Sequence, residues 1–290
     1  MNVLIVGCGY LGLRCADRWL ATGANVAALT RSPGRAAEMR GRGIDPFVGD
    51  VQEAESLRGR PASDVRLYAV GYDRGSGASK QAVYVDGLRN VLHAVRGRAG
   101  RIIYVSSSSV YGQESGEWID ENSPTEPRTE GGRICLDAEQ LLAREADAQS
   151  LPWCTLRLTG LYGPGRVLAI VYDLRRRAPL AGSGDAWLNL IQIEDAAMAV
   201  TEVAASRPRE RLYLVTDDQP VQRREYYAQL AELVGAPPPE FDPERAPRHG
   251  TGLNKRCLNR RFKREFGIAW RYPTIETGLP AALATGSARD

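Results

Sequence analysis

Short apolar runs alternate with amphipathic segments through the first half of the chain. The runs end at glycine or polar residues, have the length of buried strands, and cover residues 3–6, 26–29, 47–48, 65–70, 102–105 and 154–158. Between them, apolar residues recur at helical spacing over 11–20, 80–95 and 132–147. Because strands that alternate with helices form parallel sheets with right-handed crossovers, the pattern predicts an α/β fold with a doubly wound parallel sheet.

The pattern changes beyond residue 160. Residues 161–190 combine glycine and proline with a run of three arginines. A further apolar run predicts a strand that returns to the sheet, within residues 210–216. We therefore predict a division into a sheet domain over 1–160 and a mixed α/β lobe over 161–290.

A G-x-G-x-x-G motif joins the first predicted strand to the first predicted helix. Gly7 allows the tight turn, Gly9 lets the backbone approach a pyrophosphate, and Gly12 lets the helix pack closely on the strand. The helix N-terminus, which begins at Tyr10 and Leu11, supplies free N–H groups and a positive dipole end for phosphates. In this strand–turn–helix context the motif predicts a Rossmann-type dinucleotide-binding domain, and the second lobe is then a substrate lobe.

The residues after the second predicted strand decide between the two nicotinamide dinucleotides. An NAD-binding domain places Asp or Glu there to hold the ribose 2′-hydroxyl, whereas this chain has Arg31 and Ser32, with Arg35 just beyond. The planar fork of arginine binds a 2′-phosphate with charge assistance. We therefore predict NADP(H) as the cofactor, with Arg31 and Ser32 as contacts of its 2′-phosphate and Arg35 as a further cofactor-binding residue. If Arg31 is only a solvated loop residue, the cofactor is NAD.

Two stretches in the middle of the chain carry a resemblance to a known family. They are S-S-S-S-V-Y-G at residues 106–112 and R-T-E-G-G-R-I-C-L-D-A-E at residues 128–139. With L-N-L-I-Q-I-E-D-A-A at 188–197, they resemble the extended short-chain dehydrogenases/reductases of the NAD-dependent epimerase/dehydratase group. The resemblance covers the chain from its first residue to about residue 235.

The resemblance implies further contacts with the cofactor. Asp50 and Val51 follow the third strand, where the family has its adenine-contact loop. Ala69, Val70 and Gly71 occupy the turn after the fourth strand, which in the family lines the middle of the cofactor. We therefore expect all five residues to lie at the dinucleotide.

The catalytic pair of the family is missing from this chain. In the family's Y-G-x-S-K-x-x-x-E motif, the tyrosine exchanges a proton with the substrate and the lysine holds the nicotinamide ribose. The two positions here are Gly131, which has no proton to donate, and Cys135, which is too short to hold a ribose. Ser107 occupies the family's serine position and could still polarise a substrate oxygen. The alternative is that these serines only end a strand by bonding local backbone.

Another side chain must then act as the acid, or no proton transfer occurs. Tyr111, Tyr162 and Asp137 are candidates because they lie near the motifs in sequence, and a structural role is the alternative for each. We name Tyr111 and Tyr162, together with Ser107, as the candidate catalytic residues. The chain in this respect resembles the atypical members of the superfamily, which keep the glycine-rich loop without the full set of catalytic residues.

Composition limits the partners. The net charge is +3, from 38 basic and 35 acidic residues, which argues against a nucleic-acid-binding protein.

No apolar run reaches the ~18 residues of a membrane span and no leader is evident, so we expect a cytoplasmic protein with a small-molecule substrate. Five cysteines without a C-x-x-C pair predict free thiols and no metal site. The resemblance also implies a homodimer, in which helices near 80–96 and 132–148 pair.

Three functions remain open at this stage. The first is an NADP(H)-dependent oxidoreductase or epimerase/dehydratase-like enzyme that uses a non-standard proton donor on a small or nucleotide-linked substrate. The second is a non-catalytic NADP(H)-binding sensor or scaffold. The third is an enzyme of another class on this fold, because a fold does not determine a function.

Overall fold

The computed structural model describes residues 1–59, 62–94, 96, 100–245 and 253–284. Their contacts form two compact units. Unit 1 comprises Met1–Val110, Glu130–Arg157 and Ala197–Tyr213, and unit 2 comprises the described residues of Tyr111–Thr129, Leu158–Ala196 and Leu214–Asp290. The division at residue 160 into separate domains stays a prediction.

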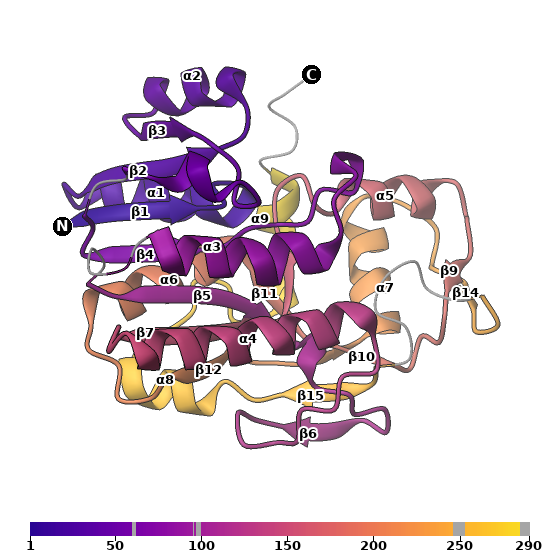
Figure 1. Cartoon of the computed structure of the whole chain (residues 1–290). Helices are drawn as coiled ribbons and strands as arrows, with labels where there is room; N and C mark the ends of the chain where they lie inside the picture. Colours follow the sequence, from indigo (N-terminus) through magenta and orange to yellow (C-terminus); the bar gives the residue numbers. More distant parts are fainter. Residues whose placement is uncertain (60–61, 95, 97–99, 246–252, 285–290) are drawn as a thin grey trace. The chain divides into compact units, whose positions relative to one another are not determined.

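A seven-stranded sheet is the centre of unit 1 (Figure 1). Its strands, in spatial order, are β12 (Leu212–Val215), β7 (Trp153–Leu158), β5 (Ile102–Ser107), β4 (Val65–Tyr68), β1 (Asn2–Val6), β2 (Asn25–Thr30) and β3 (Asp45–Val48). The pairs from β5 to β3 are parallel. The amides of Thr155 and Thr159 donate to the carbonyls of Arg211 and Val215, and this constant offset makes β7 and β12 parallel too. The predicted doubly wound parallel sheet is confirmed.

Helices cover both faces of this sheet (Figure 1). One face carries α1 (Tyr10–Ala21) and α6 (Ile193–Ala205), where Arg18 Nε donates to Thr201 Oγ1 at 3.2 Å. The other face carries α3 (Gly87–Ala94) and α4 (Glu130–Ala148), whose apolar side chains pack on Leu4, Val6 and Tyr104 of the strands. Helix α2 (Pro33–Gly41) follows β2.

The helix predicted over 80–95 is not regular. Residues Lys80 and Gln81 are α-helical, and the wider π-helical turn η3 (Ala82–Asp86) follows before α3 begins. The predicted last residue, Val95, lies outside the described residues. Three short 3₁₀ turns complete unit 1, and they are η1 (Ala54–Leu57), η2 (Arg74–Ser76) and η4 (Ser108–Val110).

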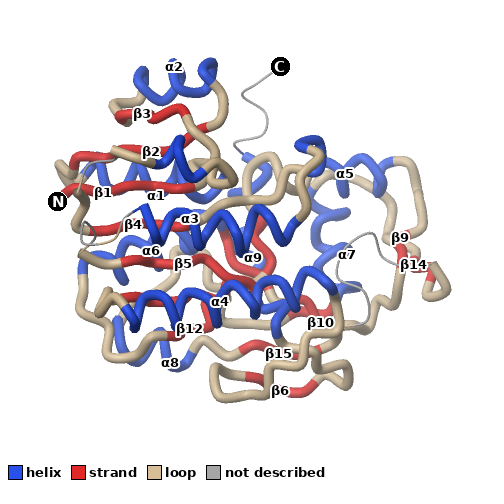
Figure 2. The backbone as a smooth tube through the Cα atoms, viewed as in Figure 1, coloured by secondary structure: helices blue, strands red, loops and turns tan. Residues whose placement is uncertain are grey.

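Unit 2 is built from small two-stranded pairs and short helices (Figure 2). The pairs are β6 (Glu117–Ile119) with β15 (Lys255–Cys257), β8 (Gly160–Tyr162) with β11 (Leu190–Gln192), β9 (Leu180–Ala181) with β14 (Phe241–Asp242), and β10 (Trp187–Leu188) with β13 (Val221–Gln222). The helices are α5 (Leu168–Arg175), α7 (Arg223–Leu233), α8 (Arg260–Phe266) and α9 (Ile275–Ala284). Tyr162, Leu230 and Leu279 belong to a core shared by β8, α5, α7 and α9.

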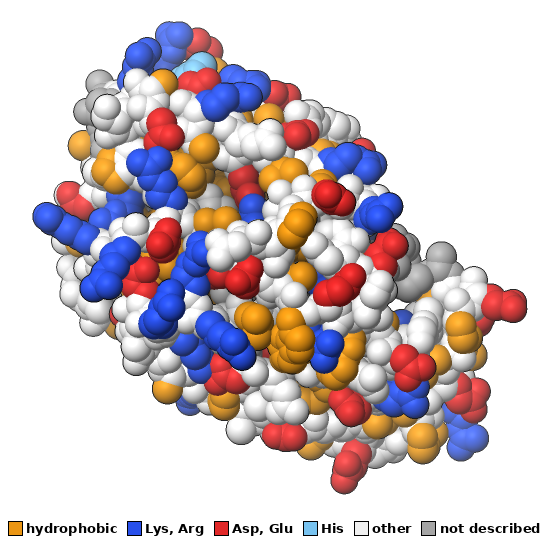
Figure 3. All heavy atoms as spheres, turned by 90° about the horizontal axis from the view of Figure 1, so that it is seen from below, with side chains coloured by type: hydrophobic (Ala, Val, Ile, Leu, Met, Phe, Trp, Pro, Cys, Tyr) orange, Lys and Arg blue, Asp and Glu red, His pale blue; other side chains and the backbone are white. Residues whose placement is uncertain are grey.

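On the face shown in Figure 3, basic and acidic side chains are interspersed. Within the described ranges, no helix combines the length and the apolar character needed to cross a bilayer.

Candidate cofactor and catalytic site

A cavity of about 360 Å³ opens in unit 1 at the carboxyl ends of β1, β2, β3 and β4. Crevices at this edge of a parallel sheet are where doubly wound folds bind their ligands. Its lining includes eight of the residues predicted for the cofactor, which are Gly7, Gly9, Arg31, Arg35, Asp50, Val51, Val70 and Gly71. Segments that are distant in sequence therefore meet at one cavity, and its lining includes two glycines of the motif and the two arginines from which the cofactor site was predicted.

The three motif glycines face different surroundings. Gly7 has φ +98°, and a Cβ there would overlap the backbone of Ala69. A Cβ on Gly12 would lie 2.5 Å from the carbonyl oxygen of Gly7. Around Gly9, by contrast, no described atom outside Gly9 and its two chain neighbours lies within 4 Å of the Cβ position. The protein's own packing therefore requires two of the glycines, while the third leaves bare backbone facing open space.

Open backbone at Gly9 fits a pyrophosphate. Gly9 is the N-cap residue of α1 and has no side chain to occupy the free N–H groups of the first turn. That turn contains no acidic residue that would repel an anion. Free N–H groups and the positive end of the helix dipole together favour a phosphate at this point.

Four of the predicted cofactor residues shape the cavity from behind its lining. Leu11 is buried in the core, and Tyr10 lies under the guanidinium of Arg14, which is 4.3 Å from its ring centroid. The Ala69 amide donates to the Val6 carbonyl and so fixes the turn after β4. Ser32 is the N-cap of α2. With Gly12, these residues support the site rather than face the cavity.

Two arginines that follow β2 line the cavity, Arg31 directly after the strand and Arg35 in α2. Arg31 forms an ion pair with Asp73 (Nη2 to Oδ2, 3.0 Å), and both side chains are about half exposed. Arg35 extends to the glycine turn and donates from Nη2 to the Cys8 carbonyl at 3.3 Å. Ser32 Oγ accepts the Arg35 amide at 3.3 Å, which begins α2 beside these side chains. A phosphate bound here would meet two cations, although Arg31 is partly neutralised by Asp73.

Asp50 also lines the cavity and is held by its own turn. Its Oδ1 accepts the Gln52 amide at 2.9 Å, and its amide donates to Ser56 Oγ at 2.9 Å. These bonds fix the carboxylate, which retains a second oxygen for a donor such as an adenine amino group.

The serines at the end of β5 have two separate roles. Ser106 donates to Glu139 Oε1 at 2.5 Å, and Glu139 forms a buried ion pair with Arg157. This network ties α4 to β5 and β7. Ser107 Oγ accepts the Ser109 amide at 3.1 Å and is half-buried, so its hydroxyl hydrogen is available to a substrate oxygen.

The two predicted tyrosines lie in the interior of unit 2. The Tyr111 side chain is fully buried, and its carbonyl accepts Lys255 Nζ at 2.5 Å. Tyr162 is buried with its hydroxyl against the backbone of Gly278 in α9, and burial raises its pKa above the ordinary value. A phenol buried this completely is a poor donor, because no substrate oxygen can reach it. The structure gives neither tyrosine support as a proton donor.

Gly131 and Cys135, the two positions that the resemblance assigns to the family's catalytic pair, lie on α4 in unit 1. Cys135 is partly buried, and this burial raises the pKa of its thiol to about 11, so the group is neutral at physiological pH. Asp137 is exposed on the same helix. A cation lies beside Gly131: Lys80 Nζ is 3.9 Å from the position that a Cβ on Gly131 would take. Lys80 is not among the site residues predicted from the sequence.

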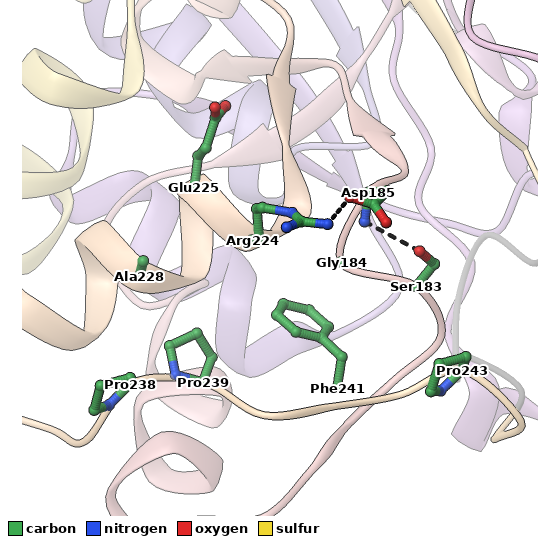
Figure 4. Close-up of a pocket in the computed structure, with 10 residues that line it drawn as sticks. All are labelled: Ser183, Gly184, Asp185, Arg224, Glu225, Ala228, Pro238, Pro239, Phe241 and Pro243. Atoms are coloured by element: carbon green, nitrogen blue, oxygen red, sulfur yellow. Dashed lines mark hydrogen bonds and ion pairs between the residues drawn. The ribbon is translucent and has the colours of Figure 1, made fainter.

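A second cavity, of about 620 Å³, lies in unit 2 (Figure 4). Phe241 and three prolines form its apolar side, and Arg224 forms an ion pair with Asp185 across from them. None of the predicted site residues lines it. Arg223 stacks beside it on Tyr227 and Phe241, so its guanidinium is held by the lobe itself.

Comparisons with known proteins agree with the geometry of unit 1. The sequence model of the NAD dependent epimerase/dehydratase family matches residues 3–215. Protein YeeZ of Escherichia coli K12 is 29% identical over 284 residues, which cover 94% of this chain and 96% of that protein. A 4-hydroxy-2-methyl-3-oxo-4-farnesyl-3,4-dihydroquinoline-1-oxide ketoreductase of Stigmatella aurantiaca is 26% identical over 79% of this chain and 72% of its own length.

A solved structure shares the fold. The UDP-glucose 4-epimerase of Thermus thermophilus, determined as a complex with NAD, superposes with a TM-score of 0.84 over the whole of both chains at 21% identity. The glycine turn, the parallel sheet and the match of the family across most of the sequence lead to one conclusion. The chain belongs to the NAD-dependent epimerase/dehydratase family.

Proposed function

We propose that the chain is an NADP(H)-dependent oxidoreductase that acts on a small carbonyl compound or the corresponding alcohol. The observation that carries this proposal is the open backbone at Gly9, which no packing inside the protein explains and which a pyrophosphate would fill. The similarity to a ketoreductase supports the reaction class.

Each part of the cavity has a distinct task in this proposal. The glycine turn and the start of α1 bind the pyrophosphate, Asp50 binds the adenine, and Val70 and Gly71 line the middle of the dinucleotide. When bound, the nicotinamide supplies or accepts a hydride. Ser107 orients a substrate oxygen through its hydroxyl hydrogen.

The choice of NADP(H) over NAD(H) depends on the end of β2. Arg31 and Arg35 place two guanidinium groups beside the cavity, and no carboxylate occupies the strand end itself. A 2′-phosphate would compete with Asp73 for Arg31, since the two anions need the same guanidinium. Arg35, whose hydrogen bond is to a neutral carbonyl, is the stronger candidate for the phosphate.

A non-catalytic NADP(H)-binding protein is the second candidate, and one observation favours it: α4 has no side chain at Gly131 and a neutral thiol at Cys135.

A screen that follows NADPH absorbance with a panel of aldehydes, ketones and nucleotide-linked keto sugars separates the oxidoreductase from the non-catalytic protein. The oxidoreductase predicts substrate-dependent NADPH consumption. NADPH binding without consumption across the panel would favour the sensor.

A further inference from the structure

We infer that Tyr84 is the proton donor of this site and that Lys80, one helical turn before it, supplies the positive charge that holds the nicotinamide ribose. The inference rests on the proposed function, which does not say which side chain donates the proton. Both residues lie in unit 1, on the segment that leads into α3, and neither belongs to the glycine motif or to α4.

The local backbone places the two side chains on one face. Residues four apart on a helix are neighbours on its surface, and Lys80 and Tyr84 are four apart on the segment that includes the π-helical turn Ala82–Asp86. Ser79 begins this segment by accepting the Ala82 amide on its Oγ at 3.0 Å. The buried Tyr68 hydroxyl donates to the Val83 carbonyl at 2.8 Å, which satisfies a group of the widened turn.

This face is directed at the positions where α4 lacks its pair. Lys80 Nζ lies 3.9 Å from the Cβ position of Gly131 and 3.8 Å from Glu130 Oε2. Both Lys80 and Tyr84 are close enough to Cys135 to interact electrostatically with its thiol. A large side chain on Gly131 would take the space that the ammonium now occupies.

The Tyr84 hydroxyl lies at the border of the cofactor cavity. Its oxygen accepts the amide of Tyr72 at 3.0 Å, and both Tyr72 and Val83 line the cavity. No acceptor for its hydrogen lies within bonding distance among the residues that the structure describes. The oxygen is thus fixed while its proton remains available. Burial raises the pKa of Tyr84, so the phenol is protonated at neutral pH, as a donor must be.

The reductive step balances with these groups. The Tyr84 O–H bond breaks and its proton goes to the substrate carbonyl oxygen, while the carbonyl carbon receives a hydride with its electron pair from NADPH, which is oxidised to NADP⁺. The carbonyl becomes an alcohol. Water then returns a proton to the Tyr84 phenolate.

Lys80 is tested by affinity alone, in calorimetric titrations of the full chain with NADPH and with 2′-phospho-ADP, which lacks both the nicotinamide and the ribose that carries it. Losing a charge-assisted hydrogen bond should make Lys80→Met bind NADPH roughly tenfold more weakly and leave the affinity for 2′-phospho-ADP unchanged. Lys263→Met, which removes a lysine from unit 2, should bind both as the wild type does. Unchanged NADPH affinity, or an equal loss for both compounds, would overturn the role of Lys80.

A rescue separates a positioned charge from a general effect on folding. In the Lys80→Met background, Cys135→Lys should restore NADPH affinity because it returns an ammonium to the same space from α4, whereas Cys135→Met should not. Thermal melts confirm that each variant is folded. Equal affinities of the two double variants would contradict the inference.

Tyr84→Phe tests the proton donor. It should bind NADPH as the wild type does and reduce the carbonyls accepted in the screen, or butane-2,3-dione as a general probe, about 10²–10⁴ times more slowly. Tyr172→Phe, at an exposed phenol of α5, should keep the wild-type rate. An undiminished rate in Tyr84→Phe, or a wild type that binds NADPH and reduces no carbonyl, would overturn the assignment. Absence of NADPH binding in the wild type would instead refute the proposed function.

Discussion

The polar groups around the cavity of unit 1 and two polar groups in the interior of unit 2 differ in their exposure to solvent. Around the cavity of unit 1, Arg31, Arg35 and Asp50 keep contact with solvent. In unit 2, Asp217 and Cys257 are almost wholly buried, and burial raises the pKa of the Cys257 thiol to about 12 and that of the Asp217 carboxyl well above its ordinary value. An accessible charge can recognise an ion, whereas a buried neutral group mainly makes stability depend on pH. Perturbed groups therefore indicate a site only where a ligand can reach them.

Gly9→Asp should have the largest effect, because a carboxylate would occupy the open space reserved for the pyrophosphate and repel it. We expect NADPH affinity to fall at least a hundredfold, measured by calorimetry. The thermal midpoint should barely change, since no described atom outside Gly9 and its two chain neighbours lies within 4 Å of the new Cβ. Gly9→Ala is the matched control and should lose much less. A Gly9→Asp variant that binds NADPH normally would remove the main argument for the site.

Gly278→Ala probes the interior of unit 2, where the new methyl group would overlap the Tyr162 hydroxyl. Overpacking of this kind costs about 1–3 kcal/mol of unfolding free energy, which denaturant unfolding measures. Part of the loss should return in Gly278→Ala combined with Tyr162→Phe, because the hydroxyl is then gone. If the double variant is no more stable than the single one, the contact with Tyr162 is not the cause.

Arg35→Ala should separate the two dinucleotides. Loss of a guanidinium that meets the 2′-phosphate should weaken NADPH about tenfold and leave NADH unchanged. Arg42→Ala, on the same segment but outside the cavity lining, serves as the comparison. An equal loss for both dinucleotides would place Arg35 at a part of the cofactor that they share.

Asp217→Asn should have the smallest effect, and its sign depends on pH. The folded chain keeps the Asp217 proton that the unfolded chain releases, so the wild type loses stability as pH rises above the ordinary pKa of aspartic acid. The variant should therefore melt about 2–4 °C higher than the wild type at pH 8. This gain should shrink as the pH falls toward 4. A gain that does not vary with pH would show that the carboxyl is not the source.

The fold, and most of the residues that meet at the cavity of unit 1, could be predicted from sequence because their signals are local. The glycine turn, the strand before it and the arginines after β2 lie within short stretches whose spacing reports their geometry. Tyr111 and Tyr162 looked available for the same reason, since nearness to a motif in sequence does not reveal burial, which tertiary packing decides.

Lys80 and Tyr84 could not be found in this way. They matter because the segment before α3 packs against α4, which follows much later in the chain, and no local pattern reports that contact. The only signal was the spacing K-x-x-x-Y, which is common on helices. The ion pair between Arg31 and Asp73 likewise joins two loops that only the sheet brings together.

Calorimetric titration of the wild-type chain with NADPH and NADH tests the central claim most directly. The account predicts binding of NADPH at one site per chain, at least tenfold tighter than NADH. If the chain binds neither dinucleotide, the account is contradicted. The cavity at the ends of β1 to β4 would then not be a dinucleotide site, despite its glycine turn.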